Sequence, residues 1–342
     1  MFARRHLPVL LLFILAALTP PSAHAATAQP DLGAAGPFAV VVTREVWRDG
    51  SRNRDIPVKI YSPEHAVGPL PVVIFSHGLG GSVEAGETWG RQWASWGIAS
   101  VHVQHAGSDT AALRSGQMAS AMSLAQLIAR CKDVSFAASE IARRAARGDP
   151  PFAHVDATRI GLAGHSFGAQ TVEAVSGQTY PIPMPPLADS RFRAFIAFSP
   201  SARDTTNVDR EFSGITTPFL SITGSQDQIA ITPEITPQNR TLPFQHMAPG
   251  DKYLLWLDTA AHMSFAGQEI PRPRSALFAA ALGEGVVAPN QTHIDYVVKA
   301  VTTAFLIAYL QPDTPAGQRA LRWLKSNAPS DLLNPGDRFQ KR

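Results

Sequence analysis

Continuous apolar runs alternate with amphipathic segments along most of the chain. Runs such as PVVIFS at 71–76 lack regular polar positions, which is typical of strands buried on both faces of a sheet. Most of these runs end in glycine, proline or charged residues, which terminate strands. The pattern predicts eight strands, at 38–47, 56–63, 71–76, 98–105, 159–164, 192–200, 217–227 and 252–262.

Helical patterns fall between several of these strands. The spacing of three tryptophans predicts a helix over 84–97, and a long helical tract covers 117–147 before a glycine and two prolines end it. Alternating buried strands and helices predict an α/β fold, with a mostly parallel central sheet and helices on both faces. Further helices are expected at 167–176, 291–310 and 318–325.

The first 25 residues form a separate segment. Arg4 and Arg5 precede the apolar run Leu7–Leu18, and Ala23 and Ala25 mark a small-x-small cleavage position. This is the pattern of a secretory signal peptide, because twelve apolar residues are fewer than the roughly 20 that span a bilayer. We expect cleavage after Ala25, export to the periplasm or the exterior, and no stable membrane insertion of the mature chain.

The rest of the chain contains no internal repeat and no clear linker. We therefore expect one α/β domain over 26–312, followed by a polar C-terminal extension over 313–342. The sequence gives no indication of an oligomeric state.

Composition and charge exclude some classes of partner. Apolar residues make up 45% of the 342 positions, as in a globular protein with a sizeable core. Cleavage of the signal peptide would remove two of the 30 basic side chains and none of the 27 acidic ones, which leaves the mature chain close to neutral. It also contains no cluster of lysine and arginine with interleaved aromatic residues, so no nucleic-acid partner is expected. The single cysteine, Cys131, cannot form an internal disulfide and is predicted to be buried on a helix.

The clearest candidate chemistry lies in the stretch GLAGHSFG at 161–168. Ser166 stands in a G-x-S-x-G pattern between a predicted strand and a predicted helix, which is typical of a nucleophile elbow. Such a turn exposes the serine at the carboxyl edge of the sheet, and Gly164 and Gly168 let neighbouring backbone approach closely. Because serine is a poor nucleophile at neutral pH, it needs a histidine as base and a carboxylate to orient that histidine.

The base is expected downstream of the serine, since the chain order with this elbow is serine, acid, histidine. His246, His262 and His293 are the three downstream histidines. His262 directly follows an apolar strand and should lie at the same sheet edge as Ser166. His246 lies in a proline-rich loop and His293 near a helix start, so we predict His262 as the base.

Three aspartates are candidates for the acid. Asp227 ends the strand that precedes the histidine strand, so its carboxylate should reach the imidazole at hydrogen-bond distance. Asp258 is four residues from His262 and is expected on the same strand end, and Asp204 follows an earlier strand. We favour Asp227 and keep Asp258 and Asp204 as alternatives, whose ordinary role is in turns or caps.

Backbone amides should stabilise the oxyanion of the tetrahedral intermediate. The elbow supplies the amide of Phe167, and the glycine-rich loop SHGLGG offers that of Leu79. His77 in this loop is expected to organise it through hydrogen bonds. His165 cannot be the base, because adjacent side chains on a turn point apart.

Other residues are weaker candidates for the site. His105, just past a strand end, is expected at the rim of a substrate pocket, and Trp89 on the floor of that pocket unless it packs in the core. A metal site formed by His102 and His105 is not expected, because positions three apart on a strand face opposite sides. The proline-rich segment between the predicted acid and base has no clear helix and is expected to cover the site as a lid.

Several of these motifs are similar to those of a known family. VVIFSHGLGG, RIGLAGHSFGAQT, SITGSQD and TAAHMSFAG resemble segments of α/β-hydrolases, in particular plasma-type platelet-activating factor acetylhydrolases and serine-bearing dienelactone-hydrolase-like proteins. The resemblance covers 38–310 and implies an α/β-hydrolase fold, with Ser166 as nucleophile, His262 as base, and Leu79 and Phe167 as oxyanion donors.

The sequence departs from the plasma acetylhydrolases at one position. Their acid ends the strand after the elbow helix, where this chain has Ser199 and Pro200, and Asp227 one strand later matches bacterial esterases instead. The expected function is an exported serine hydrolase of short-chain carboxylic esters or lipids, without cofactor or metal. The alternatives are a polyester or lipid hydrolase with an open cleft, and a catalytically silent binding module.

Overall fold

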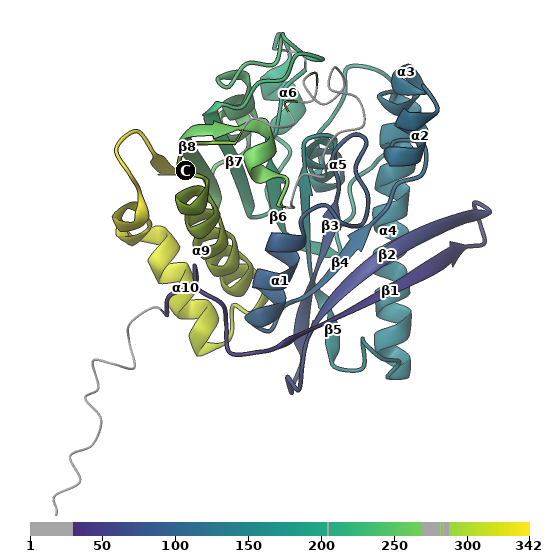
Figure 1. The fold of residues 1–342 in the computed structure, drawn as a ribbon, viewed down its shortest axis with the longest axis vertical. Helices are drawn as coiled ribbons and strands as arrows, with labels where there is room; N and C mark the ends of the chain where they lie inside the picture. Colours follow the sequence, from purple (N-terminus) through teal and green to yellow (C-terminus); the bar gives the residue numbers. More distant parts are fainter. Residues whose placement is uncertain (1–29, 204, 268–280, 282, 284–286) are drawn as a thin grey trace, which may run out of the picture.

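The computed structural model describes residues 30–203, 205–267, 281, 283 and 287–342. The predicted signal peptide at 1–25 and the candidate acid Asp204 lie outside these residues. One mixed sheet in the order β1-β2-β4-β3-β5-β6-β7-β8-β9 forms the centre of the molecule (Figure 1). Its strands are β1 Val40–Asp49, β2 Arg54–Pro63, β3 Leu70–Ser76, β4 Ala99–Val103, β5 Val155–His165, β6 Phe192–Phe198, β7 Phe219–Gln226, β8 Lys252–Ala261 and β9 Arg338–Lys341.

The six central strands, from β4 to β8, are parallel, whereas β1, β2 and β9 pair antiparallel at the two edges. In the parallel part the register pairs Ser76 with Gly164 and His165 with Phe198. The carboxyl ends of β3, β5 and β6 therefore lie level at one edge of the sheet. This mostly parallel sheet with flanking helices is the α/β fold that the sequence predicts.

Helices cover both faces of the sheet because successive side chains of each strand point to opposite sides. Val72 and Ile74 pack into one core with α4, α5 and α6, whereas Val73 and Phe75 pack into a second core with α1, α9 and α10. Figure 1 shows α9 and α10 together on one side of the sheet. The helices are α1 Glu87–Ser95, α2 Thr110–Arg114, α3 Met118–Ala121, α4 Leu124–Arg147, α5 Phe167–Ser176, α6 Val208–Phe212, α7 Leu242–His246, α9 Gln291–Leu310 and α10 Pro315–Lys325, with 3-10 turns η1 Asn239–Thr241, η2 His262–Phe265 and η3 Ala328–Leu332.

Within the described ranges, α9 is the one helix long and apolar enough to cross a membrane by length and composition. Most of this helix is buried in the molecule, and its side chains belong to the core that also contains α1 and α10. A helix buried in this way is typical of the core of a globular domain.

Three regions differ from the sequence prediction. The proline-rich segment between Asp227 and His262, predicted to have no clear helix, contains η1 and α7, and His246 is the last residue of α7. The helical tract over 117–147 is divided, because the Ser123 hydroxyl accepts a hydrogen bond from the amide of Gln126 and begins α4 anew. The polar C-terminal extension contains an unpredicted strand, β9, which pairs with β8 from Tyr253 to Trp256. The short strand has no apolar pattern, and pairing with β8 rather than burial of its own side chains determines its conformation.

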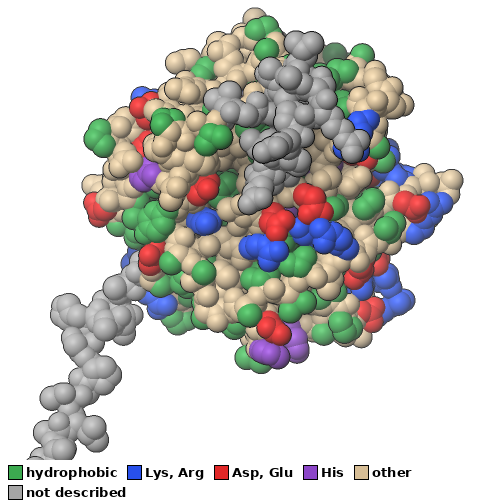
Figure 2. Space-filling model, viewed as in Figure 1, with side chains coloured by type: hydrophobic (Ala, Val, Ile, Leu, Met, Phe, Trp, Pro, Cys, Tyr) green, Lys and Arg blue, Asp and Glu red, His purple; other side chains and the backbone are tan. Residues whose placement is uncertain are grey.

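The face seen in Figure 2 carries basic and acidic side chains next to one another. Between β2 and α1, Lys59 pairs with both Glu84 and Glu87, and these glutamates also pair with Arg44 and Arg91. The charges of this cluster therefore largely compensate each other.

Candidate active site

Ser166 occupies a strained turn between β5 and α5. Its backbone has φ 57° and ψ −114°, a conformation that residues other than glycine rarely adopt. The flanking glycines are required by space: a Cβ on Gly168 would lie 1.9 Å from the carbonyl oxygen of Ser76, and one on Gly164 would lie 2.4 Å from that of Gly168. The turn therefore holds α5 directly against the end of β3, with the serine partly exposed at the sheet edge.

His262 and Asp227 lie at the same edge, at the ends of β8 and β7. The Ser166 Oγ is 2.9 Å from His262 Nε2, and His262 Nδ1 donates to Asp227 Oδ1 at 2.7 Å. With Nδ1 protonated, Nε2 is left as an acceptor for the serine hydroxyl. The structure thus brings the three residues predicted as a triad into one hydrogen-bonded row.

Asp227 is fully buried and is held by several donors. Thr223 Oγ1 donates to Oδ2 at 2.8 Å, and Arg240 Nε lies 2.9 Å from Oδ1. Burial alone raises the pKa of this carboxyl, but Arg240 and His262 lower it more, so the pKa lies well below its usual range. Asp227 is therefore charged across the range in which His262 titrates.

Two effects keep His262 neutral. Burial lowers its pKa, and the nearby Arg240 lowers it further, whereas Asp227 acts in the opposite direction and does not fully compensate. Beside it, His165 Nε2 donates to the carbonyl oxygen of His262 at 3.0 Å, and burial together with His262 lowers the pKa of His165 to about 3. His165 is thus a neutral neighbour that holds the backbone of His262.

The amides predicted as oxyanion donors flank Ser166. Phe167 is the first residue of α5, where amide groups have no partner within the helix. Leu79 lies in the loop after β3, and its amide makes no hydrogen bond to another described residue. A Cβ on Gly78 would lie 3.3 Å from that of Ser166, so this loop runs close to the serine. Both amides are available to a ligand at the serine hydroxyl.

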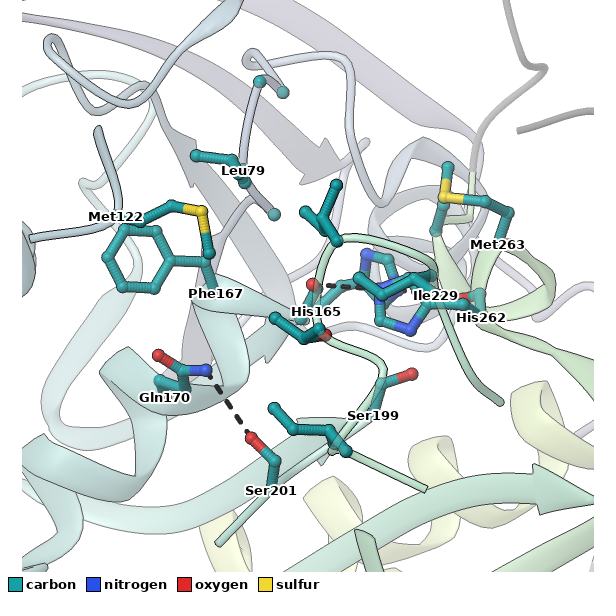
Figure 3. A pocket seen from close by; sticks show the side chains of 18 of the residues that line it. Leu79, Met122, His165, Phe167, Gln170, Ser199, Ser201, Ile229, His262 and Met263 are labelled. Carbon is teal, nitrogen blue, oxygen red and sulfur yellow. Dashed lines mark hydrogen bonds between the residues drawn. The ribbon is translucent and has the colours of Figure 1, made fainter. Parts of the chain in front are cut away.

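A cavity of about 100 Å³ lies over the triad. The loop after β7 contributes Ile229, Ile231, Thr232 and Ile235 to its wall, which is the segment predicted to cover the site. Figure 3 shows Leu79, Met122 and Phe167 on one side of this cavity and His262 and Met263 on the other. The cavity is therefore largely apolar at its walls and polar at its base. Its other lining residues include Gln170, Ser199, Ser201 and Arg240.

Two residues predicted at the pocket lie elsewhere. Trp89 is fully buried, stacks on Phe198 with ring centroids 5.6 Å apart, and donates to the carbonyl oxygen of Phe265 at 3.0 Å. It belongs to the core, which is the alternative weighed for it. His105 is also fully buried, and it does not belong to the described cavity lining.

His105 is part of a second buried row. Its Nδ1 donates to Asp133 Oδ2 at 3.0 Å, and its Nε2 accepts from Ser76 Oγ at 2.9 Å. His77, the predicted loop organiser, is buried and accepts the amide of His105 at its Nε2, at 3.0 Å. These bonds hold the loop that carries Leu79.

The remaining candidates have other partners. Asp258 accepts from Ser225 Oγ at 2.7 Å, and His246 and His293 pair with Asp209 and Asp337. His102 bonds to Ser100 and to the carbonyl of Ala85. No group of three potential metal ligands occurs in the part of the chain that the structure describes.

Arg240 is the main residue of the candidate site that the sequence analysis does not predict. It is buried, pairs with Asp227, and donates through Nη1 to the carbonyl oxygen of Ser199 at 2.9 Å. It thereby ties the predicted acid to the end of β6. An arginine in a proline-rich loop has no sequence pattern that would predict this pairing.

Comparison with known proteins adds to this geometry. Residues 39–128 match the family model described as platelet-activating factor acetylhydrolase, isoform II. The chain resembles this family of ester hydrolases. The match covers β1 to β4 and the loop with Leu79 but ends before Ser166, so it supports an α/β-hydrolase acting on esters or lipids and not the triad itself. No curated protein matches the sequence.

Proposed function

We propose that the protein is a serine hydrolase that cleaves short-chain carboxylic esters through an acyl-enzyme. The observation that carries the proposal is the row from Ser166 Oγ through His262 to Asp227 beneath an open cavity. The strained serine turn, the two free amides at Leu79 and Phe167, and the resemblance to an ester hydrolase family support it.

In the first half of the reaction, Ser166 Oγ attacks the carbonyl carbon of the ester and its proton passes to His262 Nε2. The carbonyl oxygen becomes an oxyanion and accepts hydrogen bonds from the amides of Leu79 and Phe167. Asp227 stabilises the imidazolium that forms. His262 then gives its proton to the leaving alkoxide, and the ester C–O bond breaks.

In the second half, a water molecule takes the place of the alcohol. His262 removes its proton, the resulting hydroxide attacks the acyl carbon, and the Ser166 ester bond breaks with return of the proton to Oγ. The cavity over the triad, of about 100 Å³, is large enough for a short acyl group at the reacting carbonyl.

We also propose that the protein is exported. The basic and apolar pattern at 1–25 supports a signal peptide. N-terminal sequencing of protein recovered outside the cytoplasm should begin at Ala26, and an intact Met1 would contradict export with cleavage.

The test uses two serines of this chain. Ser166→Ala is expected to abolish hydrolysis of p-nitrophenyl acetate and labelling by a fluorophosphonate. Ser76→Ala is the matched control, because Ser76 also contacts a histidine but is fully buried, and it should retain both. Undiminished hydrolysis by Ser166→Ala would overturn the proposal, and absence of labelling in the wild-type protein would favour a silent binding module. Turnover of insoluble polyester would favour an open-cleft hydrolase.

A further inference from the structure

A second cavity adjoins the one over the triad. It has a volume of about 250 Å³, and its surface is mostly apolar, with Leu124, Leu127 and Ile182 in its wall. The two cavities share part of their lining, which places the second cavity directly beside the one that contains Ser166. The residues that line both are Met122, Phe167, Gln170, Ser201 and Arg203.

One face of α5 carries a polar stripe along this wall. Ser166, Gln170 and Glu173 stand at spacings of four and three residues, which places them on the same side of the helix. Gln170 Nε2 lies 3.5 Å from Ser201 Oγ, a contact drawn in Figure 3. The stripe leads from the first cavity at Ser166 to the second cavity at Glu173.

Glu173 is a buried carboxyl with one free oxygen. The side chain is fully buried, and its Oε1 accepts from the amide of Ser201 at 3.1 Å. Its Oε2 is buried without a hydrogen-bond partner among the described residues. A buried polar oxygen without a partner is costly, and here it belongs to a residue that lines a cavity. This combination indicates a ligand that supplies the missing hydrogen bond.

Burial favours the neutral form of Glu173. Burial raises the pKa of this carboxyl well above its usual range, and Glu211 raises it further. The bond from Ser201 and the charges of Arg240 and Arg203 lower the pKa but do not compensate. A protonated carboxyl donates to an oxygen of a ligand, and an ionised one accepts from a hydroxyl. A ligand hydroxyl can pair with either form.

The position of His262 decides which part of the ester enters the second cavity. The leaving alkoxide takes its proton from His262 Nε2 and must therefore lie beside that ring. Phe167 and Met122, which lead to the second cavity, lie on the opposite side of the triad cavity from His262 and Met263 (Figure 3). The acyl part is thus the part directed toward Glu173.

We propose that the second cavity binds the acyl chain of the substrate and that Glu173 Oε2 hydrogen-bonds a hydroxyl group on that chain. This inference rests on the proposed ester hydrolysis at Ser166. Seven residues at a rise of 1.5 Å each place Glu173 about 10 Å along α5 from Ser166. The hydroxyl therefore lies several carbons from the ester carbonyl, and the substrates are esters of hydroxy acids.

The test is the ratio of kcat/KM for p-nitrophenyl ω-hydroxyoctanoate to that for p-nitrophenyl octanoate. The wild-type enzyme should prefer the hydroxylated ester roughly tenfold, the effect of one buried hydrogen bond. Glu173→Gln retains a polar group of the same shape and should keep the preference, whereas Glu173→Leu should bring the ratio to about one. A ratio near one in the wild-type enzyme, or the same ratio in Glu173→Leu, would overturn the inference.

A second variant tests the cavity without altering the carboxyl. Ile182 is half-exposed at the second cavity, so Ile182→Trp should lower kcat/KM for octanoate relative to acetate by about tenfold through loss of space. Val67→Trp, at an exposed position between β2 and β3, is the matched control and should leave this ratio unchanged. Equal ratios in both variants would contradict binding of the chain here. Absence of acetate hydrolysis in the wild-type enzyme would instead refute the proposed function.

Discussion

The molecule contains two rows of serine, histidine and aspartate with almost the same connections. In one, Ser166, His262 and Asp227 are joined by distances of 2.9 and 2.7 Å. In the other, Ser76, His105 and Asp133 are joined by 2.9 and 3.0 Å. Hydrogen-bond lengths alone do not distinguish a candidate active site from a structural network.

The surroundings of the two serines differ. Ser76 is fully buried, and its Oγ accepts a hydrogen bond from Arg130 Nη2 at 3.0 Å. Ser166 is partly exposed, lines a cavity, and stands at a strained backbone position beside free amides. A cationic donor lowers the electron density available on the serine oxygen, and burial excludes the substrate.

The two aspartates also serve different neighbours. Asp133 pairs with Arg52 and Arg54 at 2.7 and 2.8 Å and so anchors the β1–β2 hairpin to α4. Asp227 pairs with a single arginine, Arg240, through Oδ1, and its Oδ2 accepts a hydrogen bond from Thr223. The row with Asp133 stabilises the fold beneath the Leu79 loop, whereas the row with Asp227 is the one that a substrate can reach.

Replacing the histidine of each row should give the largest difference between the two rows, in activity for one and in stability for the other. His262→Gln is expected to lower kcat for p-nitrophenyl acetate by a factor on the order of 10⁴ to 10⁶, since the serine loses its base, with unchanged urea unfolding. His105→Gln should keep kcat within about tenfold but lower the free energy of unfolding by about 1–3 kcal/mol, because buried partners lose their hydrogen bonds. Loss of activity in His105→Gln with full stability would refute the distinction.

Replacing the two aspartates should distinguish the two rows in the same way, with a smaller effect on kcat. Asp227→Asn is expected to lower kcat by about 10⁴, since the amide favours the wrong tautomer of His262. Asp133→Asn should instead lower the free energy of unfolding by about 1–3 kcal/mol, because the partly buried Arg52 and Arg54 lose the charged carboxylate that they share. Steady-state kinetics and urea titrations of both variants measure this. A greater activity loss in Asp258→Asn would reassign the acid.

The smallest expected effect is on pH dependence. His262 acts as a base when neutral, so kcat/KM should rise with pH through an inflection below the usual histidine value of about 6.5. Arg240→Met removes a charge that lowers the pKa of His262, and the inflection should move to higher pH. Arg240→Lys keeps the charge and should move it less. An unchanged inflection in Arg240→Met would show that this arginine does not set the pKa of His262.

The sequence predicts the central sheet well because its strands are continuous apolar runs. It also predicts that Ser166, Asp227 and His262 lie close together, because the carboxyl ends of parallel strands meet at one edge. Strand β9 lacked such a pattern, since its partner β8 supplies its hydrogen bonds. His105 follows a strand end and Trp89 lies on a helix, and neither position reveals from the sequence whether the side chain points into the pocket or into the core. The roles of Arg240 and Glu173 are not predicted, because they depend on contacts between segments that are distant in the sequence.

The position of Glu173 is partly predictable from the sequence. A glutamate seven residues after Ser166 lies on the same helix face as that serine, and this spacing is visible in the sequence. Its burial is not, because the segments that cover it, around Ser201 and Glu211, come from elsewhere in the chain.

The two edges of the parallel sheet carry loops of different kinds. Ser166, Asp227 and His262 all follow the carboxyl ends of their strands, whereas turns such as 213–218 lead into the amino end of a strand. Loops of the first kind are where new substrate ranges can evolve by insertion. Turns of the second kind suit attachment of the protein to a solid support, since the reactive edge then faces the solution.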